Sequence, residues 1–255
     1  TGVLALRRIF PKGYVFTVLG IAVGMAGLVA LGAMGERISR FIEGGDRFVL
    51  GQISVAGEGM GMGAGFPAGG LLPAARIAEI ARVPGVAVVQ PQVMLPISTS
   101  TSHFLTLTQE LVMGVDPAAP PANRHYAALA VRSGRGLAAG DRKVAVVGSD
   151  FAASRKLAVG AALPIGGLEF TVIGILDKTL TAPDRFAMLS LEDARDLWLR
   201  RDPLLFRVFG SGGLARTDLN SGAAVGWQEG VDPDELARRI QASVKGVNVT
   251  IPGEL

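Results

Sequence analysis

VPGVAVVQP at residues 83–91 and VKGVNVTIP at residues 244–252 share the pattern Val-x-Gly-Val-x-Val-x-x-Pro. Each copy follows a segment with the apolar periodicity of an amphipathic helix, at residues 73–82 and 232–244. Each of these helices in turn follows an apolar, strand-like segment. Two strand–helix–strand units that lie far apart in the sequence predict one split α/β subdomain, interrupted by the section between them.

The interrupting section is predicted to be rich in strands. Residues 143–147 form an apolar run that is typical of a buried strand. The segments 163–165 and 168–175 flank Gly166-Gly167, which is a strong signal for the turn of a β-hairpin. We therefore predict a small β-rich lobe over residues 115–185.

A long apolar run lies near the N-terminus. Residues 14–34 contain no charged residue, in a chain that is 49% hydrophobic and 18% charged. At about 1.5 Å per residue, a helix of this length spans roughly 30 Å, the thickness of the hydrocarbon core of a bilayer. The run therefore predicts one transmembrane helix.

The charges around this run predict its orientation. Arg7, Arg8 and Lys12 precede it without any acidic residue, whereas the segment that follows it carries both signs equally. The positive-inside rule then places the N-terminus in the cytoplasm and the rest of the chain outside the inner membrane. Residues 14–255 hold 22 basic and 22 acidic residues, so the net charge of +3 is a topology signal. It does not predict binding to nucleic acid.

A cleaved export signal is the alternative at this end. Residues 7–12, RRIFPK, resemble a twin-arginine signal, and the small residues at 30–32 fit a cleavage site. The apolar run is longer than the roughly 7 to 15 residues of a signal core, which favours a retained helix.

The predicted fold class is α+β, with one N-terminal transmembrane helix followed by a two-lobed extracytoplasmic domain. The parts are the cytoplasmic N-terminus and membrane helix (1–45, with the span at 14–34), the split βαβ α/β lobe (46–114 and 186–255) and the inserted β-rich lobe (115–185).

Two sets of residues are candidates for contacts with other molecules. Gly20, Gly24 and Gly27 fall near one face of the predicted membrane helix, where small residues let a second helix approach closely. The alternative is that glycine is simply common in membrane helices. The glycine-rich stretch 57–70 lacks the Gly-Lys-Ser/Thr element of a phosphate-binding loop. Its apolar residues predict contacts with a substrate or a neighbouring subunit; they are Met60, Met62 and Phe66.

Catalytic chemistry is poorly supported. The chain has no cysteine, and its two histidines, His103 and His125, lie 22 residues apart in different predicted elements. Gly148-Ser149-Asp150 lacks the Gly-x-Ser-x-Gly pattern of a nucleophile turn, and Ser149 or Asp150 is expected to cap the following helix. We therefore expect no enzymatic activity, no metal and no cofactor in this chain.

Several segments together carry a family resemblance through their order and spacing. Leu6-Arg7-Arg8 leads into 17–24 at the start of the membrane run, and further segments lie at 77–89, 114–117, 134–141, 146–149, 157–160 and 165–176. In this arrangement the chain resembles the MacB/FtsX-type permeases of ABC transporters, with the lipoprotein-releasing permeases as relatives. The resemblance covers nearly all of the chain.

The resemblance implies a permease subunit that couples cytoplasmic ATP hydrolysis to movement of a periplasmic domain. ATP would be bound by a partner ATPase subunit, and the other implied partners are a second permease subunit, membrane lipid and a periplasmic adaptor or lipoprotein. The family has three further membrane helices after this domain, whereas the sequence ends at Leu255. We therefore expect either a fragment of such a permease or a shortened permease whose ATPase is a separate chain. The alternative function is a membrane-anchored extracytoplasmic binding module without transport activity.

Overall fold

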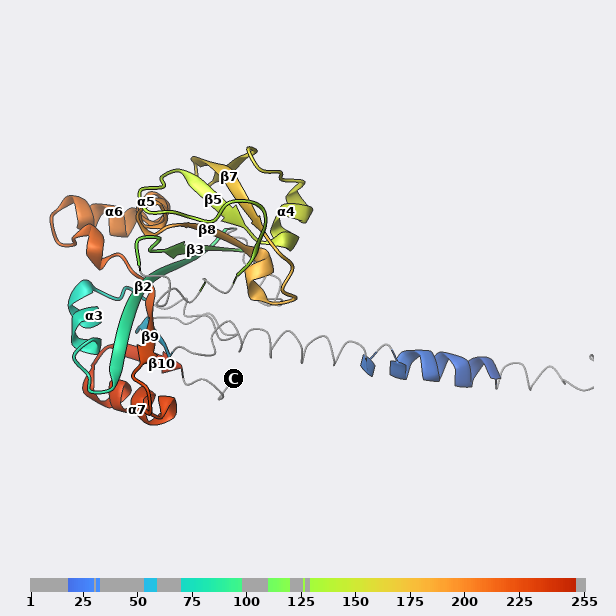
Figure 1. Cartoon of the computed structure of the whole chain (residues 1–255), viewed down its shortest axis with the longest axis horizontal. Coiled ribbons are helices and arrows are strands. Elements are labelled where there is room, and N and C mark those ends of the chain that lie inside the picture. Colours follow the sequence, from blue (N-terminus) through green and yellow to red (C-terminus); the bar gives the residue numbers. More distant parts are fainter. Residues whose placement is uncertain are drawn as a thin grey trace, which may run out of the picture. The chain divides into compact units, whose positions relative to one another are not determined.

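The computed structural model describes residues 18–29, 31–32, 53–58, 70–97, 110–119, 126 and 129–250. The chain divides into two compact units, Thr1–Glu43 and Gly44–Leu255. In the first unit, residues 18–29 and 31–32 are helical and exposed (Figure 1). None of the helices in the described ranges combines the length and apolar character needed to cross a bilayer. The predicted span 14–34 extends beyond those ranges, and the membrane helix stays a prediction.

The second unit has a mixed α/β fold built around one large sheet. The order of its strands is β10-β1-β9-β2-β3-β8-β5-β7-β4, and β6 pairs with β7 beside this path. The strands are β1 (Ile53–Gly57), β2 (Val86–Pro96), β3 (Leu111–Val115), β4 (Val131–Gly134), β5 (Val144–Val147), β6 (Ala162–Ile165), β7 (Leu168–Leu176), β8 (Phe186–Ser190), β9 (Gly222–Trp227) and β10 (Val247–Thr250). The helices are α3 (Ala74–Ile80), α4 (Ser149–Arg155), η3 (Ala182–Arg185), α5 (Leu191–Arg201), α6 (Pro203–Gly210), η4 (Arg216–Asp218) and α7 (Pro233–Ser243).

Both predicted strand–helix–strand units are confirmed, as β1–α3–β2 and β9–α7–β10. They interlock, because β9 lies between β1 and β2 while β1 lies between β9 and β10, and all neighbours are antiparallel. This is the split βαβ arrangement. Apolar residues of α3 and α7 pack on these strands in one buried cluster, the first core, which includes Ile80, Val225 and Ile240.

Strand β2 joins the two halves of the sheet. Its residues 86–92 pair with β9, and residues 93–96 pair with β3. Pro91 therefore lies where β2 has a strand partner on one side, and a register shift occurs between Val86 and Val88. This agrees with the edge or bulged role that a proline predicts in a strand. Figure 1 shows β2 running from the α3–α7 half toward β3.

In the other half of the sheet, β3 and β8 are buried on both faces, whereas most of β4 and alternate residues of β6 are exposed. Strand β3 runs parallel to β8, β8 antiparallel to β5, and β5 parallel to β7. Neighbouring residues on one strand belong to opposite faces, as the period of a strand requires. Val147 thus joins the second core, beneath α4 and α5, while Val146 joins the third core on the other face. The third core is covered by Tyr126, Leu129 and Leu137, from the segment between β3 and β5.

The predicted lobe boundaries near 115 and 185 stay a prediction. These positions fall at the end of β3 and just before β8, and the two strands pair with each other in parallel. The predicted hairpin is confirmed as β6 and β7, with Gly166 and Gly167 both at positive φ. No pattern in the sequence predicts β4, β8 or α6.

Candidate functional site: a charged junction around helix α5

Helix α5 begins where the buried strand β8 ends. The side chain of Ser190 accepts a hydrogen bond from the backbone N–H of Asp193 and caps the N-terminus of the helix. Glu192 and Asp193 place negative charge in the first turn, where the helix dipole favours it. Ala194 and Leu197 are fully buried in the second core, so the position of the helix is set by apolar packing.

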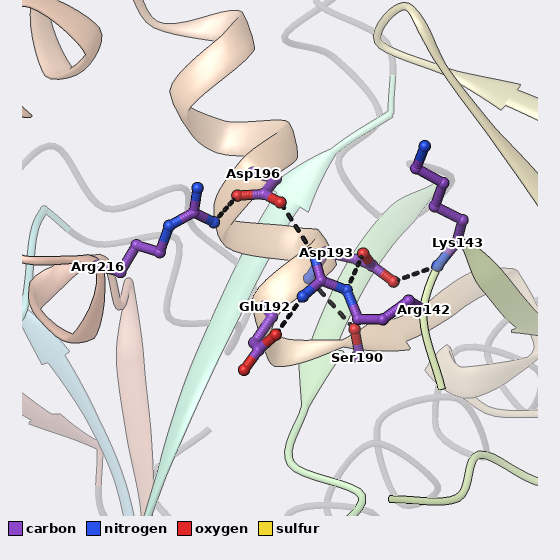
Figure 2. Close-up of polar contacts among 7 residues, drawn as sticks. All are labelled: Arg142, Lys143, Ser190, Glu192, Asp193, Asp196 and Arg216. Carbon is purple, nitrogen blue, oxygen red and sulfur yellow. Dashed lines mark hydrogen bonds and ion pairs between the residues drawn. The ribbon is translucent and has the colours of Figure 1, made fainter. Parts of the chain in front are cut away.

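Arg142, from the residues just before β5, lies against three carboxylates of α5 (Figure 2). Its Nε donates to Asp193 Oδ1 at 2.8 Å, its Nη2 donates to Asp196 Oδ2 at 3.0 Å, and its Nη1 pairs with Glu192. The side chain of Asp193 is only 4% exposed, whereas that of Arg142 is 45% exposed. The buried carboxylate therefore has a strong, charge-assisted partner that is itself open to solvent.

Asp193 also holds the backbone of the same segment. Its Oδ2 accepts a hydrogen bond from the backbone N–H of Lys143 at 2.7 Å (Figure 2). Lys143 has φ of 52°, a left-handed conformation that is uncommon for a residue with a side chain. Asp193 thus stabilises the turn that leads into β5.

Asp196 extends the cluster toward the first half of the fold. Its Oδ1 pairs with Arg216 of η4, while its Oδ2 accepts from Arg142 (Figure 2). One carboxylate on α5 therefore bridges two arginines that are far apart in the sequence.

A buried polar contact reinforces this connection. Arg195 is 9% exposed, and its Nη2 donates to Asn220 Oδ1 at 2.6 Å while its Nε donates to the carbonyl of Leu219 at 3.2 Å. Asn220 is fully buried and donates in turn to the carbonyls of Leu72 and Thr217. Leu72 belongs to the first core, so Asn220 connects α5 to the first half of the sheet. Asp193 connects the same helix to the second half.

The electrostatics of the junction favour charged arginines held in place. Desolvation alone would lower the pKa of Arg142, but the hydrogen bond to Asp193 and the charges of all three carboxylates raise it overall. Burial lowers the pKa of Arg195, although an arginine remains protonated at any ordinary pH. Within the described residues, no group of three His, Cys, Asp or Glu side chains is arranged to hold a metal ion. What this arrangement can do is fix the relative geometry of the strands that it joins.

The structure places the residues predicted from sequence elsewhere. Gly20, Gly24 and Gly27 lie in the exposed helix, and a Cβ built on any of them would meet nothing within 4 Å, so their packing role stays a prediction. The candidates in the glycine-rich stretch and both histidines lie outside the described residues; they are Met60, Met62, Phe66, His103 and His125.

The predicted cap of α4 is wrong. Its N-cap is Gly148, and no side chain makes the capping bond. A Cβ at Gly148 would lie 2.2 Å from the carbonyl oxygen of Pro183, so the close approach of this backbone explains the glycine.

No motif in the sequence predicts the contacts of the junction. The local signal is Ser190-Leu191-Glu192-Asp193, which resembles a capping box and predicts only the start of a helix. Arg142 lies 51 residues from Asp193, and no local pattern relates them.

Comparison with known proteins relates residues 14–243 to one family model, described as the MacB-like periplasmic core domain. No curated protein matches the sequence. Among solved structures, the chain is similar to the periplasmic region of MacB from Actinobacillus actinomycetemcomitans, with 11% identity, a TM-score of 0.48, and coverage of 79% of this chain and 89% of the other. It is also similar to the extracellular domain of the ABC-type transporter YknZ from Gram-positive bacteria, with 16% identity, a TM-score of 0.45, and coverage of 78% and 99%.

Proposed function

The chain belongs to the family of MacB-like periplasmic core domains, and from this premise we propose that it is a permease subunit of an ABC transporter of the MacB/FtsX/lipoprotein-release type. In this proposal, ATP hydrolysis by a cytoplasmic ATPase subunit moves the extracytoplasmic domain to export or extract a substrate. A second permease subunit, membrane lipid and a periplasmic adaptor or lipoprotein are the further partners.

The proposal places residues 14–34 across the inner membrane with the N-terminus in the cytoplasm. It is supported by the absence of charge in this run and by the three basic residues that precede it. The helical conformation of residues 18–29 and 31–32 is consistent with such a segment. Gly20, Gly24 and Gly27 would then provide a surface for a second membrane helix.

The observation that carries the mechanical part of the proposal is the junction around α5. A domain that transmits motion must keep its shape while it is moved. Helix α5 packs in the second core and is hydrogen-bonded to the segment that leads into β9 of the first half. Asp196 also helps to hold the two halves together, because it contacts both Arg142 and Arg216. We infer that the domain moves as one body when the membrane helices move.

Co-purification from membranes tests this function. The full chain, carrying an affinity tag, should bring down an ATPase identified by its nucleotide-binding sequence, and the rate of ATP hydrolysis should depend on the chain. Asn220→Ala should leave the association intact and weaken this dependence, because it removes a contact between the two halves and leaves the ATPase contact unaltered. Recovery of the chain from membranes without any ATPase would favour the alternative, a binding module without transport activity.

A further inference from the structure

A cavity of about 200 Å³ lies on the sheet face that carries the third core. Four apolar side chains from the segment before β5, from β5 itself, from β7 and from β8 line it, and all are at least nine-tenths buried: Leu137, Val146, Leu176 and Met188. These four residues are its floor. The floor offers no charged or hydrogen-bonding side chain.

The cavity reaches the surface beside Gly136. This residue lines the cavity and is itself exposed, and a Cβ added to it would meet nothing within 4 Å. Tyr126, Leu129 and Val131 are half-buried and complete the rim. The hydroxyl of Tyr126 donates to the carbonyl of Asp116 at 2.9 Å, so its polar group is already engaged. The rim is thus also apolar in character.

The backbone around the opening at Gly136, the mouth of the cavity, is fixed by contacts with Asp141 and with β7. Arg135 forms two hydrogen bonds to Asp141, at 2.6 and 2.9 Å, and Asp141 also accepts from the backbone N–H of Ala138 at 2.8 Å. The N–H of Arg135 donates to the carbonyl of Ile173 at 2.9 Å. A Cβ at Gly134 would lie 2.1 Å from that same oxygen, so only glycine permits the close approach to β7. The opening at Gly136 is therefore preformed.

We propose that this cavity is a binding site for a small apolar group, an aromatic ring or a branched alkyl group of roughly eight carbon atoms. An apolar cavity of about 150 Å³ stays dry and takes up benzene, so a cavity somewhat larger accommodates a substituted ring. Drug-sized ligands occupy roughly 300 Å³ or more, which excludes them here. Met188 in the floor can adjust its rotamers to the shape of the ligand. This inference goes beyond the proposed function, which needs no such ligand.

Toluene is the probe, and the full chain in lipid nanodiscs is the sample. The free toluene concentration is set through the vapour phase, so that partitioning into lipid does not change it. The methyl group of Met188, labelled with ¹³C, should shift saturably as toluene is added. The methyl groups of Met94 and Met113 belong to the same core without lining the cavity, and they should shift much less.

Variants at the mouth and the floor decide whether the shift reports this cavity. Gly136→Leu adds a side chain in open space and should raise the apparent dissociation constant at least about tenfold, and Val146→Leu, which fills the floor, should also weaken binding. Gly210→Leu is the matched control, because Gly210 is also exposed with nothing within 4 Å of a Cβ, and it should change binding less than about twofold. The proposal is overturned if the wild-type shift does not saturate, or if both cavity variants bind toluene as the wild type does.

Discussion

Among single residues, Asp193 is the buried carboxylate that joins the start of α5 to the two residues before β5. Its two oxygens accept from the side chain of Arg142 and from the backbone of Lys143, and its own N–H donates to Ser190. Glu192, its neighbour, contacts the same arginine, but its side chain is 63% exposed. Exposed ion pairs contribute little, whereas a buried acceptor of two hydrogen bonds contributes much more.

We therefore expect Asp193→Ala to lower the free energy of unfolding by about 2 kcal/mol, since it leaves the N–H of Lys143 without its acceptor. Glu192→Ala, the matched control, should change it by less than about 0.5 kcal/mol. Chemical denaturation of the full chain in detergent measures both values. Equal losses for the two variants would contradict the assignment of the buried carboxylate as the centre of the junction.

Asp141 provides a pH-dependent prediction. Its hydrogen bonds with Arg135 hold the pKa of this carboxyl below its ordinary value of 3.8. A carboxyl whose pKa is lowered in the folded state adds stability above its ordinary pKa, and this stability is lost as the pH falls through the folded pKa. We expect the ¹³C titration midpoint of Asp141 to rise in Arg135→Gln. An unchanged midpoint would show that the pair does not form in solution.

At the scale of elements, the β6–β7 hairpin is tied to α5 through its turn. A Cβ on Gly166 would lie 2.5 Å from Cδ1 of Leu197, a fully buried side chain of α5. The same Cβ on Gly167 would meet nothing within 4 Å, although both glycines have positive φ. Both positions require a left-handed backbone conformation, but only Gly166 is packed against another side chain.

Gly167→Ala should consequently reduce stability by about 1 kcal/mol, the price of an L-residue in the left-handed region. Gly166→Ala should reduce it by about 1 to 3 kcal/mol more, because it also overpacks the contact with α5. Thermal unfolding of the two full-length variants, compared side by side, measures the difference. Equal effects would mean that the hairpin does not pack on Leu197.

At the scale of the whole molecule, strand β2 and helix α5 connect two halves that have separate apolar cores. The chain has two tryptophans, and they report on different cores. Trp198 packs against the second core, and Trp227 packs against the first. Each therefore senses the unfolding of its own half.

In variants that keep one tryptophan, Trp198→Phe or Trp227→Phe, the fluorescence midpoints of denaturant unfolding should coincide, as expected for a cooperative unit. Adding Asn220→Ala should separate them, since it removes the buried partner of Arg195 and the contact with Leu72. Separate midpoints before this change would show that the two halves unfold independently.

The sequence by itself determined the elements whose signals are local. The repeated Val-x-Gly-Val pattern, the amphipathic helices and the Gly166-Gly167 turn all correspond to observed features. These signals act over a few residues, because turn geometry and amphipathic periodicity are properties of neighbouring positions. The family resemblance rested on the order of such segments, and the family model confirms it.

Only the tertiary structure decided the rest. Strand β8 and the pairing of β3 with it, the partners of Arg142, and the cavity at Gly136 all depend on residues distant in sequence. An arginine before a strand has many available carboxylates, and a short apolar run has no periodicity that fixes its neighbours. The strand neighbours, the partners of Arg142 and the cavity are fixed only when the apolar faces pack. Packing brings particular side chains within hydrogen-bond distance and leaves a particular space unfilled.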